Sequence, residues 1–209
     1  LCDRHTGVGA DGLFIVSPSE DDEFILDYYN ADGSWETLCA NGSRCAARFM
    51  YDRGVVDTKM FFTAGDGQHC AKIIVGDSVA MSMKLPIYKS DCINVEGVQG
   101  YFIDSGARHF VCESENFDQD YILNLGRKIR YASVFQPQGI NVNFYRFSID
   151  NSIEIKTYEK GVEKVMLSCA SGSAAVVFHL SKTNSLTSPV TTRSDGGKLS
   201  FTFDDDWKN

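Results

Sequence analysis

Two short stretches of this chain repeat one pattern, and the repeat restricts the folds open to it. Residues 38–47 read Leu-Cys-Ala-Asn-Gly-Ser-Arg-Cys-Ala-Ala, and residues 168–177 read Ser-Cys-Ala-Ser-Gly-Ser-Ala-Ala-Val-Val. In both, C-A-[NS]-G-S leads into small residues and a helical pattern. Internal similarity of this kind indicates a repeated structural unit. The repeat therefore predicts that each half of the chain presents a cysteine at the start of a helix.

Strand patterns dominate the rest of the chain. Short runs rich in β-branched and aromatic residues, bounded by Gly, Asp, Asn or Pro, predict strands over residues 13–16, 24–29, 59–63, 71–75, 79–85, 100–103, 109–112, 143–147 and 152–158. Helical patterns cover residues 39–53, 121–130 and 169–182, and Gly54 is well suited to end the first of them. Many strands around few helices predict an α+β fold rather than a doubly wound sheet.

The length of the chain suits two domains. Its 209 residues can form two hydrophobic cores, and the sequence Leu85-Pro86 closes the first run of strands. We therefore expect an N-terminal half over residues 1–87 and a C-terminal half over residues 88–209.

Charge and cysteine content exclude several classes of function. The 28 acidic residues outnumber the 20 basic ones, so the net charge of −8 would repel a phosphate backbone and nucleic acid is not an expected partner. No apolar run approaches the ~20 residues that cross a bilayer, so no membrane association is expected. Seven cysteines form an odd, sparse set without a C-x-x-C pair, which favours the reducing cytoplasm and argues against structural zinc or another metal.

The repeated cysteines, Cys39 and Cys169, are the strongest candidates for chemistry. Unpaired N–H groups and the positive dipole end at a helix start lower the pKa of a thiol and bind anions. Two such helix ends facing one cleft would hold a carboxylate between two thiols. One thiol could then take a proton from a carbon while the other returns a proton to the opposite face, which inverts a stereocentre. The residues expected to shape the two carboxylate sites are Ala40, Asn41, Gly42, Ala170, Ser171 and Gly172.

A simpler interpretation competes with this one. A free cysteine is most often a small buried apolar residue, and only the repeat raises the case for catalysis. Two further side chains could activate a thiol: His109, after the glycine turn at Gly106, and Glu159, at a strand end ahead of Cys169. Taken singly, either residue would more often be structural.

The chain resembles the diaminopimelate epimerase family. The likeness starts from residues 30–34, Asn-Ala-Asp-Gly-Ser, followed by residues 38–45, which are similar to the family signature N-A-D-G-S…C-G-N-G-x-R-C. It continues through residues 3–12, 139–144, 158–163 and 168–172, in the family's order and over nearly the whole chain.

The resemblance implies an isomerase that works without pyridoxal phosphate or another cofactor. It implies two similar strand-rich, barrel-like domains, each around a central helix, with the active site in the cleft between them. By position, Cys39 and Cys169 match the two catalytic cysteines, which exchange the roles of thiolate base and thiol acid. His109 matches the residue that assists the first cysteine, and Glu159 the residue that assists the second. Asn30, Asn141 and Lys160 fall at substrate-binding positions.

Departures from the family pattern gather at substrate recognition. Alanines follow both cysteines where the family has glycine, and Ser171 replaces a threonine. Lys160 replaces an arginine, so a bidentate grip on a distal carboxylate becomes a point charge, and Arg108 could replace some of that charge. The chain begins without Met and lacks the family's first and last strands, so we expect both termini to be incomplete.

The expected function is therefore the interconversion of LL- and meso-diaminopimelate in lysine biosynthesis. Two alternatives stay open: a racemase of another amino acid, such as histidine or a proline derivative, and a homologue that binds an amino acid without converting it. The expected partner is a small amino-acid substrate, and a homodimer is compatible with the sequence.

Overall fold

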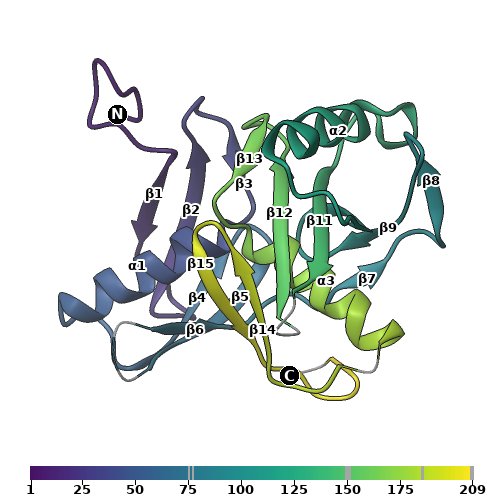
Figure 1. Cartoon of the computed structure of the whole chain (residues 1–209). Helices are drawn as coiled ribbons and strands as arrows, with labels where there is room; N and C mark the ends of the chain where they lie inside the picture. Colours follow the sequence, from purple (N-terminus) through teal and green to yellow (C-terminus); the bar gives the residue numbers. More distant parts are fainter. Residues whose placement is uncertain (75, 77, 149–151, 185, 208–209) are drawn as a thin grey trace. The chain divides into compact units, whose positions relative to one another are not determined.

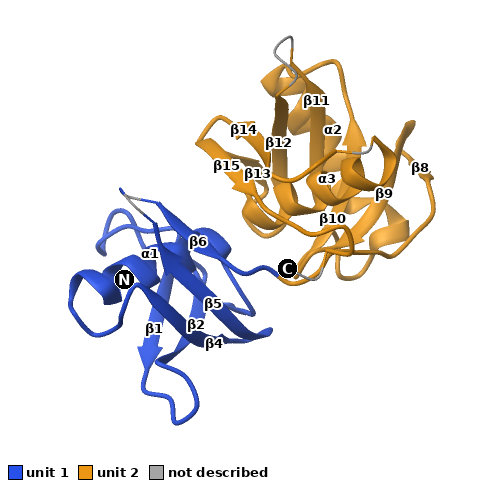
Figure 2. Ribbon diagram, turned by 90° about the horizontal axis from the view of Figure 1, so that it is seen from below, with its two compact units in different colours: residues 1–83 blue, residues 84–209 orange. Residues whose placement is uncertain are grey.

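The computed structural model describes residues 1–74, 76, 78–148, 152–184 and 186–207. The chain divides into two compact units, residues 1–83 and residues 84–209 (Figure 2). Each unit combines one sheet with one or two α-helices (Figure 1). The hydrophobic core residues of each unit come from that unit alone. The expected α+β class is confirmed.

The first unit contains a six-stranded sheet and one helix. Its elements are β1 (Gly12–Ser17), β2 (Phe24–Asn30), β3 (Trp35–Glu36), α1 (Ala40–Asp52), β4 (Lys59–Ala64), β5 (Gly67–Ile73) and β6 (Val79–Met81). The strand order is β1-β2-β4-β5-β6, with β3 paired to β2. Ala47 of α1 packs with a core that includes Phe24, Phe62 and Met60. Helix α1 ends as the sequence predicts, since Gly54 adopts a φ of +67° that favours glycine.

The second unit contains a nine-stranded sheet between two helices. Its elements are β7 (Ile87–Tyr88), β8 (Ile93–Val95), β9 (Val98–Asp104), β10 (Arg108–Glu113), α2 (Gln119–Tyr131), the 3-10 turn η1 (Ser133–Phe135), β11 (Asn141–Phe147), β12 (Ile153–Glu159), β13 (Lys164–Met166), α3 (Ala170–Thr183), β14 (Val190–Ser194) and β15 (Gly197–Phe201). The strand order is β15-β14-β12-β11-β10-β9-β7, with β13 paired to β12 and β8 to β9.

The two faces of this second sheet pack against different helices. Phe110, Phe144 and Tyr158 pack with α2, whereas Val111 and Ile155 pack with α3. Neighbouring side chains of a strand point to opposite faces, which produces this division. Helix α3 is buried over residues 172–180, so it forms the central helix expected for this half.

The sequence repeat corresponds to a repeated topology. In the first unit β2 pairs antiparallel with β3, and α1 then leads to β4, which lies parallel to β2 and antiparallel to β5. In the second unit β12 pairs antiparallel with β13, and α3 leads to β14, which lies parallel to β12 and antiparallel to β15. The two cysteine helices therefore occupy equivalent positions in the two units.

Every predicted strand overlaps a strand of the structure, and all three predicted helices are present. The predicted strand over residues 79–85 ends at Met81, and residue 75 of the predicted strand 71–75 lies outside the described residues. Six strands were not predicted: β3, β7, β8, β13, β14 and β15.

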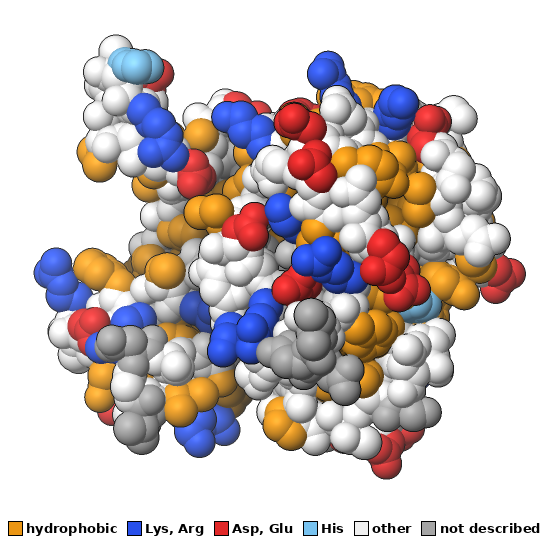
Figure 3. Space-filling view, in the orientation of Figure 1, with side chains coloured by type: hydrophobic (Ala, Val, Ile, Leu, Met, Phe, Trp, Pro, Cys, Tyr) orange, Lys and Arg blue, Asp and Glu red, His pale blue; other side chains and the backbone are white. Residues whose placement is uncertain are grey.

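Acidic and basic side chains are interspersed on the face drawn in Figure 3. Ion pairs such as Arg48 with Asp52, at 2.8 Å, link neighbouring charges. Within the described part of the chain, no helix combines the length and apolar character needed to cross a membrane.

Candidate active site

Cys39 is the N-cap residue of α1. Its backbone is extended, with φ −123° and ψ 99°, and the first intrahelical bond runs from Ser43 N–H to the Cys39 carbonyl at 2.8 Å. The N–H groups of the first turn therefore point out of the helix end, where they can meet an anion. Ala40 is helical, so it keeps its N–H in the same direction as a glycine would. A Cβ at Gly42 would overlap the ring of Phe14, which explains why glycine stands there.

A cation missed by sequence reasoning lies beside Cys39. Arg44 Nη2 donates a hydrogen bond to Asn41 Oδ1 at 2.7 Å, one turn along the helix. Burial lowers the pKa of the Arg44 guanidinium, and the nearby thiols of Cys45 and Cys39 oppose that shift. The same electrostatic interaction favours the thiolate form of the two cysteines. This contact could have been predicted from the sequence, because residues three positions apart on a helix, such as Asn41 and Arg44, lie on the same face.

Asn30 is placed by the tight turn between β2 and β3. Its side-chain amide donates to Ser34 Oγ at 3.1 Å, and its backbone N–H donates to the Ser34 carbonyl at 2.9 Å. Hydrogen bonds from the Ser34 hydroxyl and N–H lower the pKa of Asp32, so the turn carries a fixed negative charge. Asn30 thus lies at the end of β2, as Glu159 lies at the end of the equivalent strand β12.

Cys169 is the matching N-cap residue of α3. Its φ of −138° and ψ of 108° are close to those of Cys39, and Ser173 N–H donates to its carbonyl at 2.9 Å. Its sulfur lies 3.6 Å from Ser171 Oγ, and Ala170 begins the helix. The structure brings Cys169, Ala170, Ser171 and Gly172 together at one helix end, as predicted.

His109 lies beside this second cysteine helix. Its Nε2 is 3.0 Å from Ser171 Oγ, and its side chain is fully buried. Burial lowers the pKa of His109 to about 3, so the ring is neutral at pH 7. A neutral histidine with this pKa is a poor acceptor of a proton from a thiol. The assignment of His109 to Cys39, which rests on the resemblance, stays a prediction.

Two buried polar residues that the sequence analysis missed support His109. Asn143 Nδ2 lies 3.0 Å from His109 Nδ1 and 3.3 Å from the Phe110 carbonyl, and Thr157 donates to Asn143 Oδ1 at 2.9 Å. A Cβ at Gly172 would overlap Asn143 Oδ1 and lie 3.3 Å from His109 Nδ1, so only glycine lets α3 approach this closely. The sequence did contain an indication of this polar site. Asn141 and Asn143 are two residues apart in an otherwise apolar strand, so their side chains lie on the same face.

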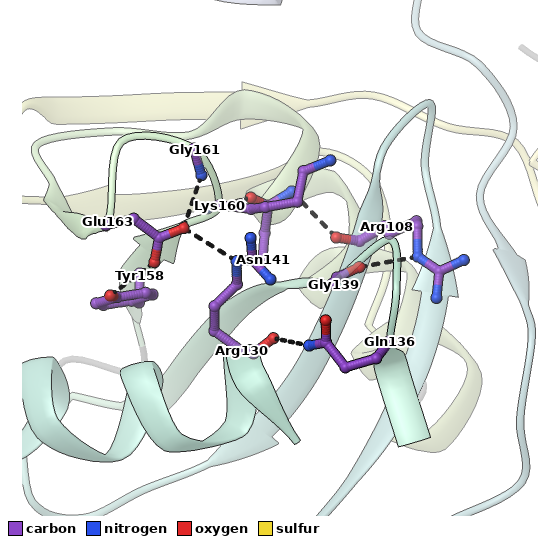
Figure 4. A network of polar contacts seen from close by, with 9 residues as sticks. All are labelled: Arg108, Arg130, Gln136, Gly139, Asn141, Tyr158, Lys160, Gly161 and Glu163. Atoms are coloured by element: carbon purple, nitrogen blue, oxygen red, sulfur yellow. Dashed lines mark hydrogen bonds and ion pairs between the residues drawn. The ribbon is translucent and has the colours of Figure 1, made fainter. Parts of the chain in front are cut away.

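Asn141 joins the ends of two strands (Figure 4). Its Nδ2 donates to the Arg108 carbonyl at 3.0 Å, and its Oδ1 accepts from Lys160 N–H at 2.8 Å. Arg108 Nε donates to the Gly139 carbonyl at 3.0 Å, while its guanidinium stacks on Phe102. Asn141 therefore joins the backbones of Arg108 and Lys160 at one end of these strands.

Glu159 ends β12 at the same edge. Its backbone carbonyl accepts from Glu163 N–H at 2.8 Å, and its strand position pairs with Lys164. Glu163 itself accepts from Tyr158, Gly161 and Arg130, which fixes the turn after Glu159 (Figure 4). By strand alternation from Thr157, the side chain of Glu159 lies on the α3 face, in the same row as His109 and Asn141.

The described residues hold no group of three or more His, Cys, Asp or Glu side chains that could bind a metal ion. Each of the two helix ends presents a thiol and the backbone N–H groups of a first helical turn.

Comparison with known proteins identifies the family. The family model for diaminopimelate epimerase matches residues 1–82. The diaminopimelate epimerase of Aquifex aeolicus is 39% identical over 84% of this chain and 65% of its own length. That of Flavobacterium psychrophilum is 35% identical over 97% of this chain and 78% of its own length. This chain thus spans about two thirds to four fifths of the length of these relatives.

Solved structures support the fold. A hydroxyproline epimerase from Agrobacterium vitis, solved with bound trans-4-OH-L-proline, superposes with a TM-score of 0.78 at 14% identity, over 95% of this chain and 69% of that one. A phenazine biosynthesis protein of the PhzF family from Bacillus anthracis gives 0.70 at 12% identity, over 92% of this chain and 76% of that one. At these identities the likeness concerns the fold alone. The identities to the curated relatives, together with the repeated cysteine helices, show that the chain belongs to the diaminopimelate epimerase family.

Proposed function

We propose that this protein epimerises the α-carbon of an amino acid without pyridoxal phosphate, converting LL-diaminopimelate to meso-diaminopimelate. One observation carries the proposal: each unit presents a cysteine as the N-cap of its helix, at an equivalent place in a repeated topology. The curated relatives that bear the name diaminopimelate epimerase supply the substrate.

The proposed reaction needs one base and one acid. The thiolate of one cysteine removes the α-proton and becomes a thiol, and the thiol of the other donates its proton to the opposite face and becomes a thiolate. The reverse reaction uses the same groups with their roles exchanged. The N–H groups of the two helix starts would hold the α-carboxylate and stabilise the carbanion electrostatically.

The two cysteines have different helpers in this proposal. Arg44 would favour the thiolate of Cys39 through its charge, whereas Ser171 would act on Cys169 through a hydrogen bond. Lys160, whose backbone N–H donates to Asn141, would face the distal carboxylate. We also place the reaction in the cytoplasm, because catalytic thiols must stay reduced.

The test uses solvent deuterium. Incubation with LL-diaminopimelate in deuterium oxide should give meso product that carries one α-deuterium, measured by chiral chromatography and mass spectrometry. Parallel incubations with proline, hydroxyproline and histidine test the alternative substrates. Exchange into one of those amino acids, with none into diaminopimelate, would overturn the substrate.

Substitution of the thiols tests the two-base assignment. We expect Cys39→Ser and Cys169→Ser each to lower epimerisation by at least ~1000-fold, because a serine hydroxyl is a far weaker acid and base at neutral pH. Cys92→Ser, at an exposed cysteine of the second unit, is the matched control and should keep full turnover. Normal turnover by either catalytic variant would contradict the proposal.

A further inference from the structure

We propose that Ser171 is a positioning residue that donates a hydrogen bond to the Cys169 thiolate, and that neutral His109 sets the direction of this bond. The inference deepens the proposed function and rests on it, because it concerns the thiol to which that function gives a catalytic role. It assigns His109 the part of a hydrogen-bond donor rather than a base.

Hydrogen bonds run in series from Asn143 through His109 and Ser171 to Cys169, and their direction is fixed at the buried end, at Asn143. A backbone carbonyl only accepts hydrogen bonds, so the amide atom 3.3 Å from the Phe110 carbonyl is Asn143 Nδ2. The same nitrogen has a second hydrogen, which it directs to His109 Nδ1 at 3.0 Å. Nδ1 of His109 is therefore the acceptor and carries no proton.

A neutral imidazole without a proton on Nδ1 carries one on Nε2. His109 Nε2 therefore donates to Ser171 Oγ at 3.0 Å. With its oxygen acting as acceptor, the hydroxyl of Ser171 is set to donate its own proton to Cys169 Sγ at 3.6 Å. A hydrogen bond from a neutral donor favours the charged form of an acceptor, so it stabilises the thiolate over the thiol.

The residues in this hydrogen-bond series are held in place by further contacts. Ser105 donates to the Ser171 carbonyl at 2.7 Å, which fixes the first turn of α3 against the end of β9. Thr157 holds Asn143 Oδ1, and Gly172 admits Asn143 beneath the helix. A donor that is fixed before the thiolate forms costs no reorganisation when the charge appears.

Other titratable side chains lie near this hydrogen-bond series. Cys112 donates to the Asn143 carbonyl, and burial raises the pKa of its thiol, which keeps it uncharged. By strand alternation Glu159 lies on the α3 face of the sheet, and Lys160 and Lys164 follow it at the end of β12 and the start of β13. Tyr145 contacts His179 farther along α3.

The test is the pH dependence of Cys169 alkylation in the full-length chain, without substrate. Iodoacetamide modifies the thiolate, and mass spectrometry of the Cys169 peptide separates it from the other cysteines. Ser171→Ala should raise the midpoint of the alkylation profile by about one pH unit, the effect of losing one hydrogen bond to a charged group. Ser181→Ala, a serine at the far end of the same helix, is the control and should leave the midpoint unchanged.

Rescue separates this role from a merely structural one. Ser171→Thr keeps the hydroxyl and should restore the original midpoint. An unchanged midpoint in Ser171→Ala, or a Thr variant that behaves as the Ala variant does, would overturn the inference.

If the Ser171→Ala protein loses its native circular dichroism spectrum, a second pair of variants tests the inference instead. His109→Gln places an amide N–H near the position of Nε2 and cannot act as a base, so its midpoint should match that of the unsubstituted protein. His109→Leu removes the donor and should raise the midpoint. Equal midpoints in these two variants would overturn the role given to His109. Alkylation requires no turnover, so failure here is distinct from failure to exchange an α-proton.

Discussion

At the scale of single residues, His69 shows how two acceptors fix a protonation state. Its Nε2 lies 2.9 Å from Asp66 Oδ1 and its Nδ1 lies 3.1 Å from the Ser82 carbonyl. Neither partner can donate when Asp66 is ionised, so these contacts favour the ring with a proton on both nitrogens, the imidazolium. Burial by itself would lower the pKa of His69, but these hydrogen bonds outweigh it and the pKa is raised.

This raised pKa makes the first unit more stable in mild acid. A histidine whose pKa is higher in the folded state contributes stability that is complete below its unfolded value near 6.5, and that is lost as the pH rises through the folded pKa. We expect the free energy of unfolding of the parent protein to fall between pH 6 and pH 9 by more than that of His69→Gln. Urea unfolding at both pH values measures this difference. Equal losses in the two proteins would contradict the assignment.

At the scale of elements, the two cysteine helices differ in how their glycines are packed. A Cβ at Gly42 would meet the edge of the Phe14 ring, and a Cβ at Gly172 would meet the Asn143 amide. Phe14 is only partly buried and can move with its stacking partner Tyr28, whereas Asn143 is fully buried and held by three hydrogen bonds.

We therefore predict that Gly172→Ala is the more damaging of the two substitutions. It should cost about 1–3 kcal/mol through overpacking and should also displace His109, so turnover should fall with stability. Gly42→Ala should cost less than this. Chemical unfolding together with the deuterium exchange assay compares the two variants, and equal effects on both measurements would count against the packing argument.

The strands and helices were largely predictable because their signals are local. Alternation identified β10 and β12, and Gly54 correctly marked the end of α1. The hairpin of β14 and β15 was missed although the Asp195-Gly196 pair between them is a strong turn signal. The predicted strand at residues 79–85 ended early because the Ser82 side chain, rather than its backbone, accepts the Cys70 N–H at 2.8 Å.

The candidate site was predictable only in part. The repeat identified Cys39 and Cys169, because the pattern C-A-[NS]-G-S can be read directly from the sequence. The link from His109 through Ser171 to Cys169 joins residues 62 positions apart, and no local pattern records that contact. Asn143 and Thr157 met across a strand pair whose register a single sequence does not specify.

At the scale of the whole molecule, stability is divided between separate cores. Phe62 is fully buried in the first unit and stacks on Phe24 with ring centroids 5.3 Å apart, while Phe110 is fully buried in the second unit against α2. The core cluster of the first unit contains only residues of that unit, and the same holds for both clusters of the second. A cavity made in one core should therefore weaken that unit first.

Phe62→Ala should cost the first unit about 3–5 kcal/mol, as large-to-small core substitutions do. Hydrogen exchange followed by mass spectrometry should show faster exchange in peptides from β2, β4 and β5, with β10, β11 and β12 little changed, because amides open in cooperative local units. Phe110→Ala is the reciprocal control and should give the opposite pattern. If each substitution accelerated exchange equally in both units, the chain would unfold as one cooperative body, and the stability of either cysteine helix would depend on both cores.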